Sequence, residues 1–169
     1  MAVNQASDSG PRPGYLSVRL DPGGVSVSYL SSLLRVLQAA LREVARDNEQ
    51  TRRHFDSKQQ PVLMVGGVRA GDGLTLDLTF ADSLDSSALE ALSSHTFNAF
   101  LDKLGEYVRK LPQPGLWGGA ARRPPLWQLE TDLARRMDQV YVELRRIPKV
   151  TVSYQDRAIE VEGDRMEIV

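Results

Sequence analysis

The side chains that most often carry nucleophilic or metal chemistry are scarce in this sequence. The 169 residues include no cysteine and two histidines, His54 and His95. His95 stands beside Ser93 and Ser94, but residues one or two apart on a helix point in different directions, so a Ser-His pair would need a partner from elsewhere in the fold. No Gly-x-Ser-x-Gly nucleophile motif occurs. The inventory therefore favours binding over catalysis, and we assign no catalytic residue.

Carboxylates are the second group that could carry chemistry. Glu160 and Glu162 would project from one face of a strand, with further acids nearby in the sequence, and such oxygens suit Mg²⁺ or Ca²⁺. Acids that alternate with Ile159 and Val161 are also typical of a strand whose outer face meets solvent, and no EF-hand spacing is present. We therefore expect no metal and no cofactor. A carboxylate-dependent enzyme would need two acids that converge in one pocket, which only the fold can reveal.

Two glycine-rich segments invite comparison with phosphate-binding loops. Such loops place their glycines between a strand and the N-terminus of a helix, whereas Gly71-Asp72-Gly73 stands between two apolar segments of strand character. This arrangement predicts the turn of a β-hairpin. The pair Gly66-Gly67, inside the first of these strands, indicates a bulge or a close approach of another part of the chain.

The segment 112–125 is the longest irregular stretch, with four prolines and three glycines. Together with the residues just after it, it holds both tryptophans of the protein around two arginines: Trp117, Arg122, Arg123 and Trp127. Tryptophan and arginine are enriched among the residues that dominate protein interfaces. We predict that these four residues contact a protein partner. The alternative is that Trp127 packs under the following helix while Trp117 folds over the core.

Paired arginines allow a rival interpretation, a module that recognises phosphate on RNA or a nucleotide. Arg135 and Arg146 are eleven residues apart, about three helical turns, so on a continuous helix they would share a face. Arg122 and Arg123 of the preceding loop would complete the phosphate site. Acidic residues dilute this helix, and mixed charge is usual on a solvated helical surface. Nucleic acid therefore remains the alternative partner.

The spacing of apolar residues indicates the elements that must position these side chains. Alternation at every second residue predicts strands near 15–20, 74–80, 150–154, 159–161 and 166–168, and the apolar, β-branched run 62–68 predicts one more. Apolar stripes with helical spacing cover 30–44, 89–111 and 129–144, with Ser26 or Ser28 as the cap of the first helix and Pro124-Pro125 near the start of the third. The polar stretch 47–60 is expected to be a frayed helix end followed by a loop.

This order of elements predicts an α+β fold. We expect a two-layer sandwich in which about three helices cover one face of a mainly antiparallel sheet. The ferredoxin-like pattern βαββαβ lies within the order if the third helix is an addition. Residues 1–14, rich in small and polar residues, are predicted to be a disordered tail, and residues 15–169 to form a single domain.

Composition restricts the partners. With 21 basic and 22 acidic residues, no overall field draws the chain to nucleic acid or to an anionic membrane, and no apolar run is long enough to span a bilayer. The absence of cysteine suits a reducing cytoplasm. We expect a non-enzymatic cytoplasmic module that binds another protein or itself, as an adaptor or a homodimer. Besides the tryptophan loop, the exposed sheet edges are candidate contacts, including a terminal strand near 166–169 that a second copy could extend.

Overall fold

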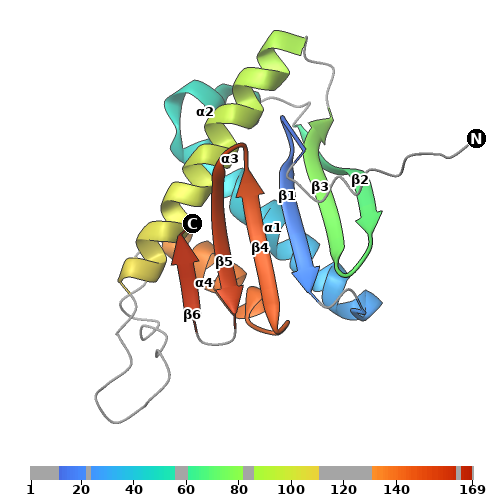
Figure 1. The fold of residues 1–169 in the computed structure, drawn as a ribbon. Coiled ribbons are helices and arrows are strands. Elements are labelled where there is room, and N and C mark those ends of the chain that lie inside the picture. Colours follow the sequence, from blue (N-terminus) through green and yellow to red (C-terminus); the bar gives the residue numbers. More distant parts are fainter. Residues whose placement is uncertain are drawn as a thin grey trace, which may run out of the picture.

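The fold was analysed in a computed structural model that describes residues 12–21, 24–55, 61–81, 86–110, 131–162 and 165–168. It has two layers, an antiparallel sheet and a set of helices that cover one of its faces (Figure 1). The strands are β1 (Leu16–Asp21), β2 (Val62–Ala70), β3 (Leu74–Ala81), β4 (Lys149–Tyr154), β5 (Arg157–Glu162) and β6 (Arg165–Ile168). The helices are α1 (Val27–Asp47), α2 (Glu49–Phe55), α3 (Ser86–Arg109) and α4 (Asp132–Leu144). The predicted α+β sandwich is confirmed.

The strands lie in the order β2-β3-β1-β4-β5-β6, and every neighbouring pair is antiparallel. The first four strands in this order, with helices between β1 and β2 and between β3 and β4, have the ferredoxin-like arrangement. Strands β5 and β6 extend this sheet through two hairpins. Two added helices, α2 and α4, complete the helical layer.

Alternation along the strands separates the two faces of the sheet. Leu16, Val18 and Leu20 of β1 are fully buried, and their partners on β3 and β4 are apolar residues that are buried or, in the case of Leu74, partly buried. This inner face packs against the helices. The residues between them are polar and form the outer face, which no described helix covers (Figure 1). An antiparallel sheet commonly has one face in the core and one face in solvent.

The helices are placed by their caps and their apolar stripes. Ser26 caps α1, because its side chain accepts a hydrogen bond from the Tyr29 backbone N–H at 3.1 Å. Between the layers, a chain of aromatic rings joins helix and sheet. Phe80 of β3 stacks on Phe97 of α3, with ring centroids 5.4 Å apart, and Phe97 in turn contacts Tyr154 of β4 edge-on. These contacts fix α3 against the inner face.

Two boundaries differ from the sequence prediction. The stretch expected to be a frayed end and a loop contains α2, a short helix whose Phe55 is fully buried and whose Thr51 donates to the Ala45 carbonyl. Helix α4 begins only at Asp132, because Thr131 is in an extended conformation and its side chain accepts from the Ala134 N–H. The expected start at Pro124-Pro125 lies outside the described residues; the first turn of α4 begins after Thr131, whose side chain provides the acceptor of the cap.

Candidate protein-contact surface

The residues predicted to contact a partner, Trp117, Arg122, Arg123 and Trp127, lie outside the described residues. Of the arginines in the phosphate alternative, Arg135 and Arg146 are described. Arg135 pairs with Asp132 at 3.3 Å, and Arg146 pairs with Glu143 at 3.1 Å while its guanidinium lies over the Tyr29 ring. Arg146 also follows the end of α4 by two residues, so the two arginines do not share a continuous helix. Each guanidinium is held near a carboxylate of its own chain.

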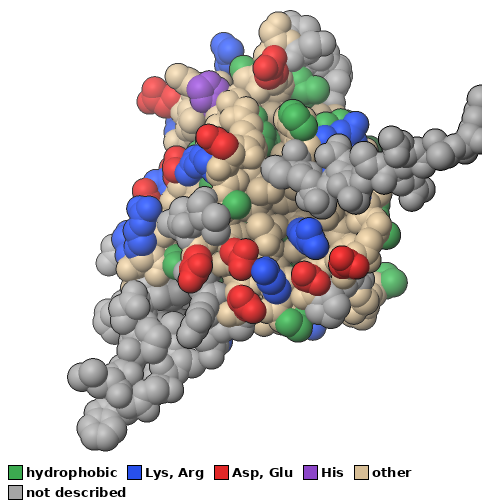
Figure 2. Space-filling view, viewed as in Figure 1, with side chains coloured by type: hydrophobic (Ala, Val, Ile, Leu, Met, Phe, Trp, Pro, Cys, Tyr) green, Lys and Arg blue, Asp and Glu red, His purple; other side chains and the backbone are tan. Residues whose placement is uncertain are grey.

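The described surface with the most exposed apolar side chains is β2. Four of them are substantially exposed: Val62 (47%), Met64 (46%), Val65 (43%) and Val68 (60%). Since β2 is the last strand on its side of the sheet, the described chain provides a hydrogen-bonded neighbour on one side of it only. An edge strand presents unpaired backbone N–H and C=O groups and so offers a template for another strand. Hydrophobic side chains reach the surface on this side of the molecule (Figure 2).

The exposure of β2 follows from where the helices end. Val65 and Val68 are paired with Leu78 and Leu76 of β3, so all four side chains point to the inner, helical side of the sheet. The two leucines are buried, whereas the two valines are not. The described helices therefore cover β3 but leave Val65 and Val68 of β2 exposed. The uncovered valines and the free backbone edge together form one surface, which we call the β2 edge (Val62–Ala70).

The β2 edge carries almost no charge that could repel an identical strand. Arg69 is its one charged residue in the sequence, and the Arg69 Nη2 group bonds to Asp77 Oδ1 of β3 at 2.9 Å. The Ser17 hydroxyl donates to the same oxygen at 2.7 Å, and Asp77 is 1% exposed. Natural edge strands are usually protected by lysines, prolines or inward-pointing charges. The single charged side chain of the β2 edge, Arg69, is therefore paired with a carboxylate of the same sheet.

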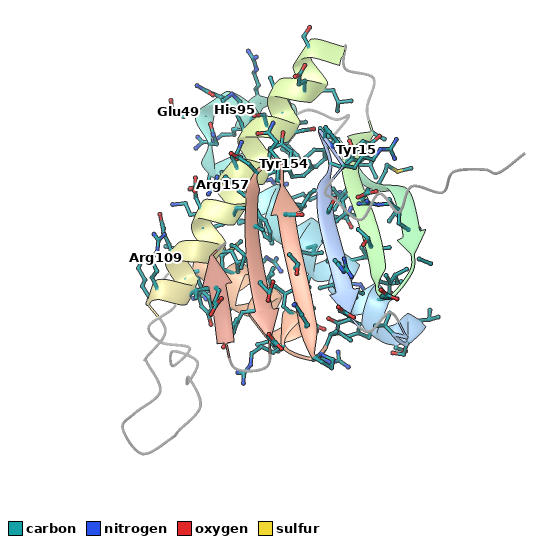
Figure 3. The ribbon with its side chains drawn as sticks, viewed as in Figure 1. Tyr15, Glu49, His95, Arg109, Tyr154 and Arg157 are labelled. Carbon is teal, nitrogen blue, oxygen red and sulfur yellow. The ribbon has the colours of Figure 1, made fainter. Side chains whose placement is uncertain are left out.

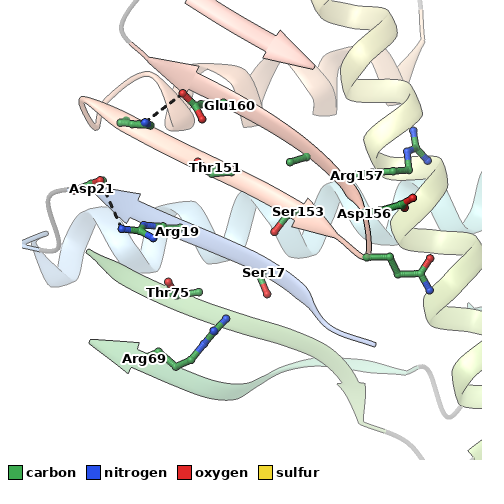
Figure 4. A pocket seen from close by; sticks show the side chains of 13 residues that line it. Ser17, Arg19, Asp21, Arg69, Thr75, Thr151, Ser153, Asp156, Arg157 and Glu160 are labelled. Atoms are coloured by element: carbon green, nitrogen blue, oxygen red, sulfur yellow. Dashed lines mark ion pairs between the residues drawn. The ribbon is translucent and has the colours of Figure 1, made fainter. Parts of the chain in front are cut away.

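The outer face of the sheet contains a shallow polar hollow of about 550 Å³ (Figure 4). Its floor is formed by Thr75, Arg19 and Thr151, which lie side by side on β3, β1 and β4. Ion pairs run between Arg19 and Asp21 at 4.0 Å and between Lys149 and Glu160 at 3.3 Å. Asp21 and Glu160, two of the acids that line the hollow, are therefore each placed beside a cation. Acidic and basic side chains are interspersed across this face (Figure 2).

Both histidines line a second hollow, of about 340 Å³, between α2 and α3. His54 and Glu49 come from α2 and His95 from α3, and Figure 3 shows Glu49 and His95 close together there. The fold thus brings together two imidazoles that are 41 positions apart in the sequence (95 − 54). Within the described ranges, however, no group of three or more histidine, aspartate or glutamate side chains is arranged to hold a metal ion.

Sequence reasoning missed the β2 edge as a surface. An apolar, β-branched run such as 62–68 predicts a strand, but the run alone does not indicate whether the strand lies at an edge or is covered by helices. One signal was available. An antiparallel sheet has one solvated face, so a strand that is apolar at nearly every position must expose part of its apolar surface unless another layer covers it.

In the described part of the chain, no helix combines the length and the apolar character required to cross a bilayer. No protein-family profile matches the sequence, and comparisons with curated proteins and with solved structures found no significant match.

Proposed function

We propose that the protein is a self-associating module whose β2 edge pairs with the β2 edge of a second copy. The exposure of Val62, Met64, Val65 and Val68 on an edge strand with almost no charge is the observation that supports this proposal. Pairing would continue the backbone hydrogen bonding of the sheet and would bury the four apolar side chains. The module would work in the cytoplasm as a homodimer or as the dimerising part of an adaptor.

A second copy is favoured over a foreign peptide because the edge is self-complementary. It is neutral apart from Arg69, which is bonded to Asp77, so two identical strands would meet without a clash of charge. A charged peptide would find no opposite charge on the strand to select it. Antiparallel pairing about a twofold axis would place the same residues on both sides of the contact, which is the commonest symmetry of homo-oligomers.

The opposite edge of the sheet is a weaker candidate. Strand β6 has four residues against nine in β2, and its sequence, Arg165-Met166-Glu167-Ile168, alternates charged and apolar positions. Short, charged edge strands are a common protection against pairing. The terminal strand predicted from the sequence is present, but the β2 edge offers more apolar surface and a longer template.

The test is the Val68→Lys variant, which places a charge in the β2 edge at a position that is already 60% exposed. Sedimentation velocity or light scattering over a dilution series should show a dimer for the natural chain and a monomer for the variant. The matched control is Val27→Lys, because Val27 is 84% exposed but lies at the start of α1 and not on the edge.

Val27→Lys should associate as the natural chain does. Circular dichroism should show all three proteins folded, since substitutions at exposed positions usually change stability by less than about 0.5 kcal/mol. A natural chain that stays monomeric at high concentration would overturn the proposal. Undiminished association of Val68→Lys would do so as well.

A further inference from the structure

The residues that precede β1 lie on the outer face of the β2 edge. Arg12-Pro13-Gly14-Tyr15 forms a tight turn in which the Tyr15 N–H donates to the Arg12 carbonyl at 3.2 Å. Gly14 has φ of 80°, the left-handed conformation that a type II turn requires at its third position, and proline suits the second. The turn is therefore determined by its own sequence and presents Arg12 and Tyr15 together. The Arg12 guanidinium lies over the Tyr15 ring, 4.4 Å from its centroid.

Both glycines inside β2 make room for this turn. A Cβ atom on Gly66 would lie 2.6 Å from Tyr15 Cε1, closer than atoms can approach, so the Tyr15 ring rests directly on the strand backbone. A Cβ atom on Gly67 would lie 3.1 Å from Arg12 Nη1 and 3.3 Å from Asp77 Oδ2. Asp77 Oδ2 is buried, and the described chain provides no hydrogen-bond partner for it.

This docking site coincides with an irregularity of the strand. The register between β2 and β3 shifts between Val65 and Gly67, so Gly66 is the extra residue of a β-bulge. A bulge interrupts the ladder and bends the strand, and natural edge strands use bulges to limit pairing with other chains. The contact of Tyr15 with Gly66 therefore falls at the point where β2 departs from a regular template.

We infer that the cradle formed by Gly66, Gly67 and Asp77 is a binding site for an arginine–aromatic pair, occupied in this chain by its own Arg12 and Tyr15. The docked turn, which we call the clamp (Arg12–Tyr15), holds β2 in its bulged form and limits self-association. This inference rests on the proposed function, because it concerns the control of the same edge. Release of the clamp would let β2 straighten into a longer and more regular strand for a second copy.

The experiment measures two quantities for Arg12→Ala, Tyr15→Ala and Gly66→Ala. The first is hydrogen–deuterium exchange of the backbone amides at 65–69, recorded in the Val68→Lys background so that dimerisation does not contribute. The second is the dimer association constant without that substitution. Arg35→Ala, which removes an exposed arginine of α1 away from the cradle, is the matched control.

The three variants should speed exchange at 65–69 and strengthen association, whereas Arg35→Ala should change neither. For Arg12→Ala we expect the exchange rates and the association constant to rise about two- to fivefold. This factor corresponds to the free energy of one exposed cation–π contact. The Tyr15→Ala and Gly66→Ala effects should not add in the double variant, because each removes the same contact. Circular dichroism of each variant verifies that the chain is folded.

Unchanged exchange in folded Arg12→Ala, Tyr15→Ala and Gly66→Ala would overturn the clamp while leaving self-association intact. Weaker association in the clamp variants would also overturn it. If the natural chain never dimerises, the proposed function fails, and the exchange rates still decide whether Arg12 and Tyr15 bind the cradle.

Discussion

Buried Asp77 lies on the outer face of the sheet, which is otherwise polar and open. Its carboxylate receives hydrogen bonds from Ser17 and Arg69 on the two neighbouring strands. Removing either partner of a buried charge pair is costly, so this network fixes β1, β3 and β2 relative to one another. The same network pairs Arg69, the one charged residue of the β2 edge, with a carboxylate inside the sheet. One carboxylate thus links the packing of three strands to the neutrality of the proposed interface.

Tyr29 provides a test of packing at a single residue. Its hydroxyl donates to the Glu143 carbonyl at 2.8 Å. Burial, together with repulsion from the Glu143 carboxylate, raises the pKa of Tyr29 to about 12, and the positive charge of Arg146 lowers this pKa by a smaller amount. An unfolded tyrosine ionises near pH 10. Between about pH 10 and pH 12 the unfolded state therefore holds fewer protons than the folded state, and this tyrosine's contribution to stability falls as pH rises.

We predict that Tyr29→Phe makes the free energy of unfolding less sensitive to pH in that window. At pH 8, where tyrosine is protonated in both states, the variant should be less stable by about 1 kcal/mol because it lacks the hydrogen bond. Urea unfolding at pH 8, 10, 11 and 12 measures both effects. Parallel loss of stability in the two proteins above pH 10 would contradict the prediction.

Among the elements, the helices depend on capping side chains that the sequence identifies only partly. Both Ser26 and Ser28 could cap α1 by residue type, and the structure selects Ser26, since its hydroxyl oxygen accepts from the Tyr29 N–H. Thr131 was not recognised as the cap of α4, because the apolar stripe continues before it to Leu129. Periodicity locates the face of a helix, whereas its first residue depends on one hydrogen bond.

We predict that Ser26→Ala lowers the free energy of unfolding by about 1 kcal/mol, the usual cost of losing a capping hydroxyl. Ser28→Ala, two residues later and inside the first turn of α1, should leave stability unchanged or raise it slightly, because alanine favours helix more than serine. Thermal and urea unfolding of the two variants compare the positions directly. Equal destabilisation would show that the cap of α1 does not act through Ser26.

The strands were more predictable than the helices. Alternation located five of the six strands and β-branched composition located β2, and Gly66-Gly67 indicated the bulge and the close approach that are both present. The composition of β2 could not indicate its exposure, because an apolar strand looks the same whether or not a helix lies beneath it. The place of a strand in the sheet is set by pairing with distant residues, such as Leu16 with Leu78, which local patterns do not record.

For the whole molecule, the predicted dimer is a single sheet that runs through two copies. The natural sequence contains no cysteine, so a cysteine introduced into β2 is the only thiol in each chain. We predict that single-cysteine variants across Val62–Ala70 form a disulfide-linked dimer at the position nearest the twofold axis, where the two Cα atoms lie within about 7 Å. Non-reducing gel electrophoresis after mild oxidation detects it.

Val27→Cys should remain monomeric on the same gels, because it lies outside the β2 edge. A cysteine at Glu167 of β6 tests the competing arrangement, in which the C-terminal strands meet. Cross-linking there, and not in β2, would move the interface to the opposite side of the sheet. Such an outcome would also remove the reason for a clamp at Gly66.

The hydroxyl-lined floor around Thr75, Arg19 and Thr151 lies on the central strands, away from both edges. A twofold axis perpendicular to the sheet would turn the floors of both copies in the same direction, as parts of one plane of twelve strands, six from each chain. Any molecule that recognises one floor would then encounter a matching pair on a common platform, and an elongated ligand could touch both at once.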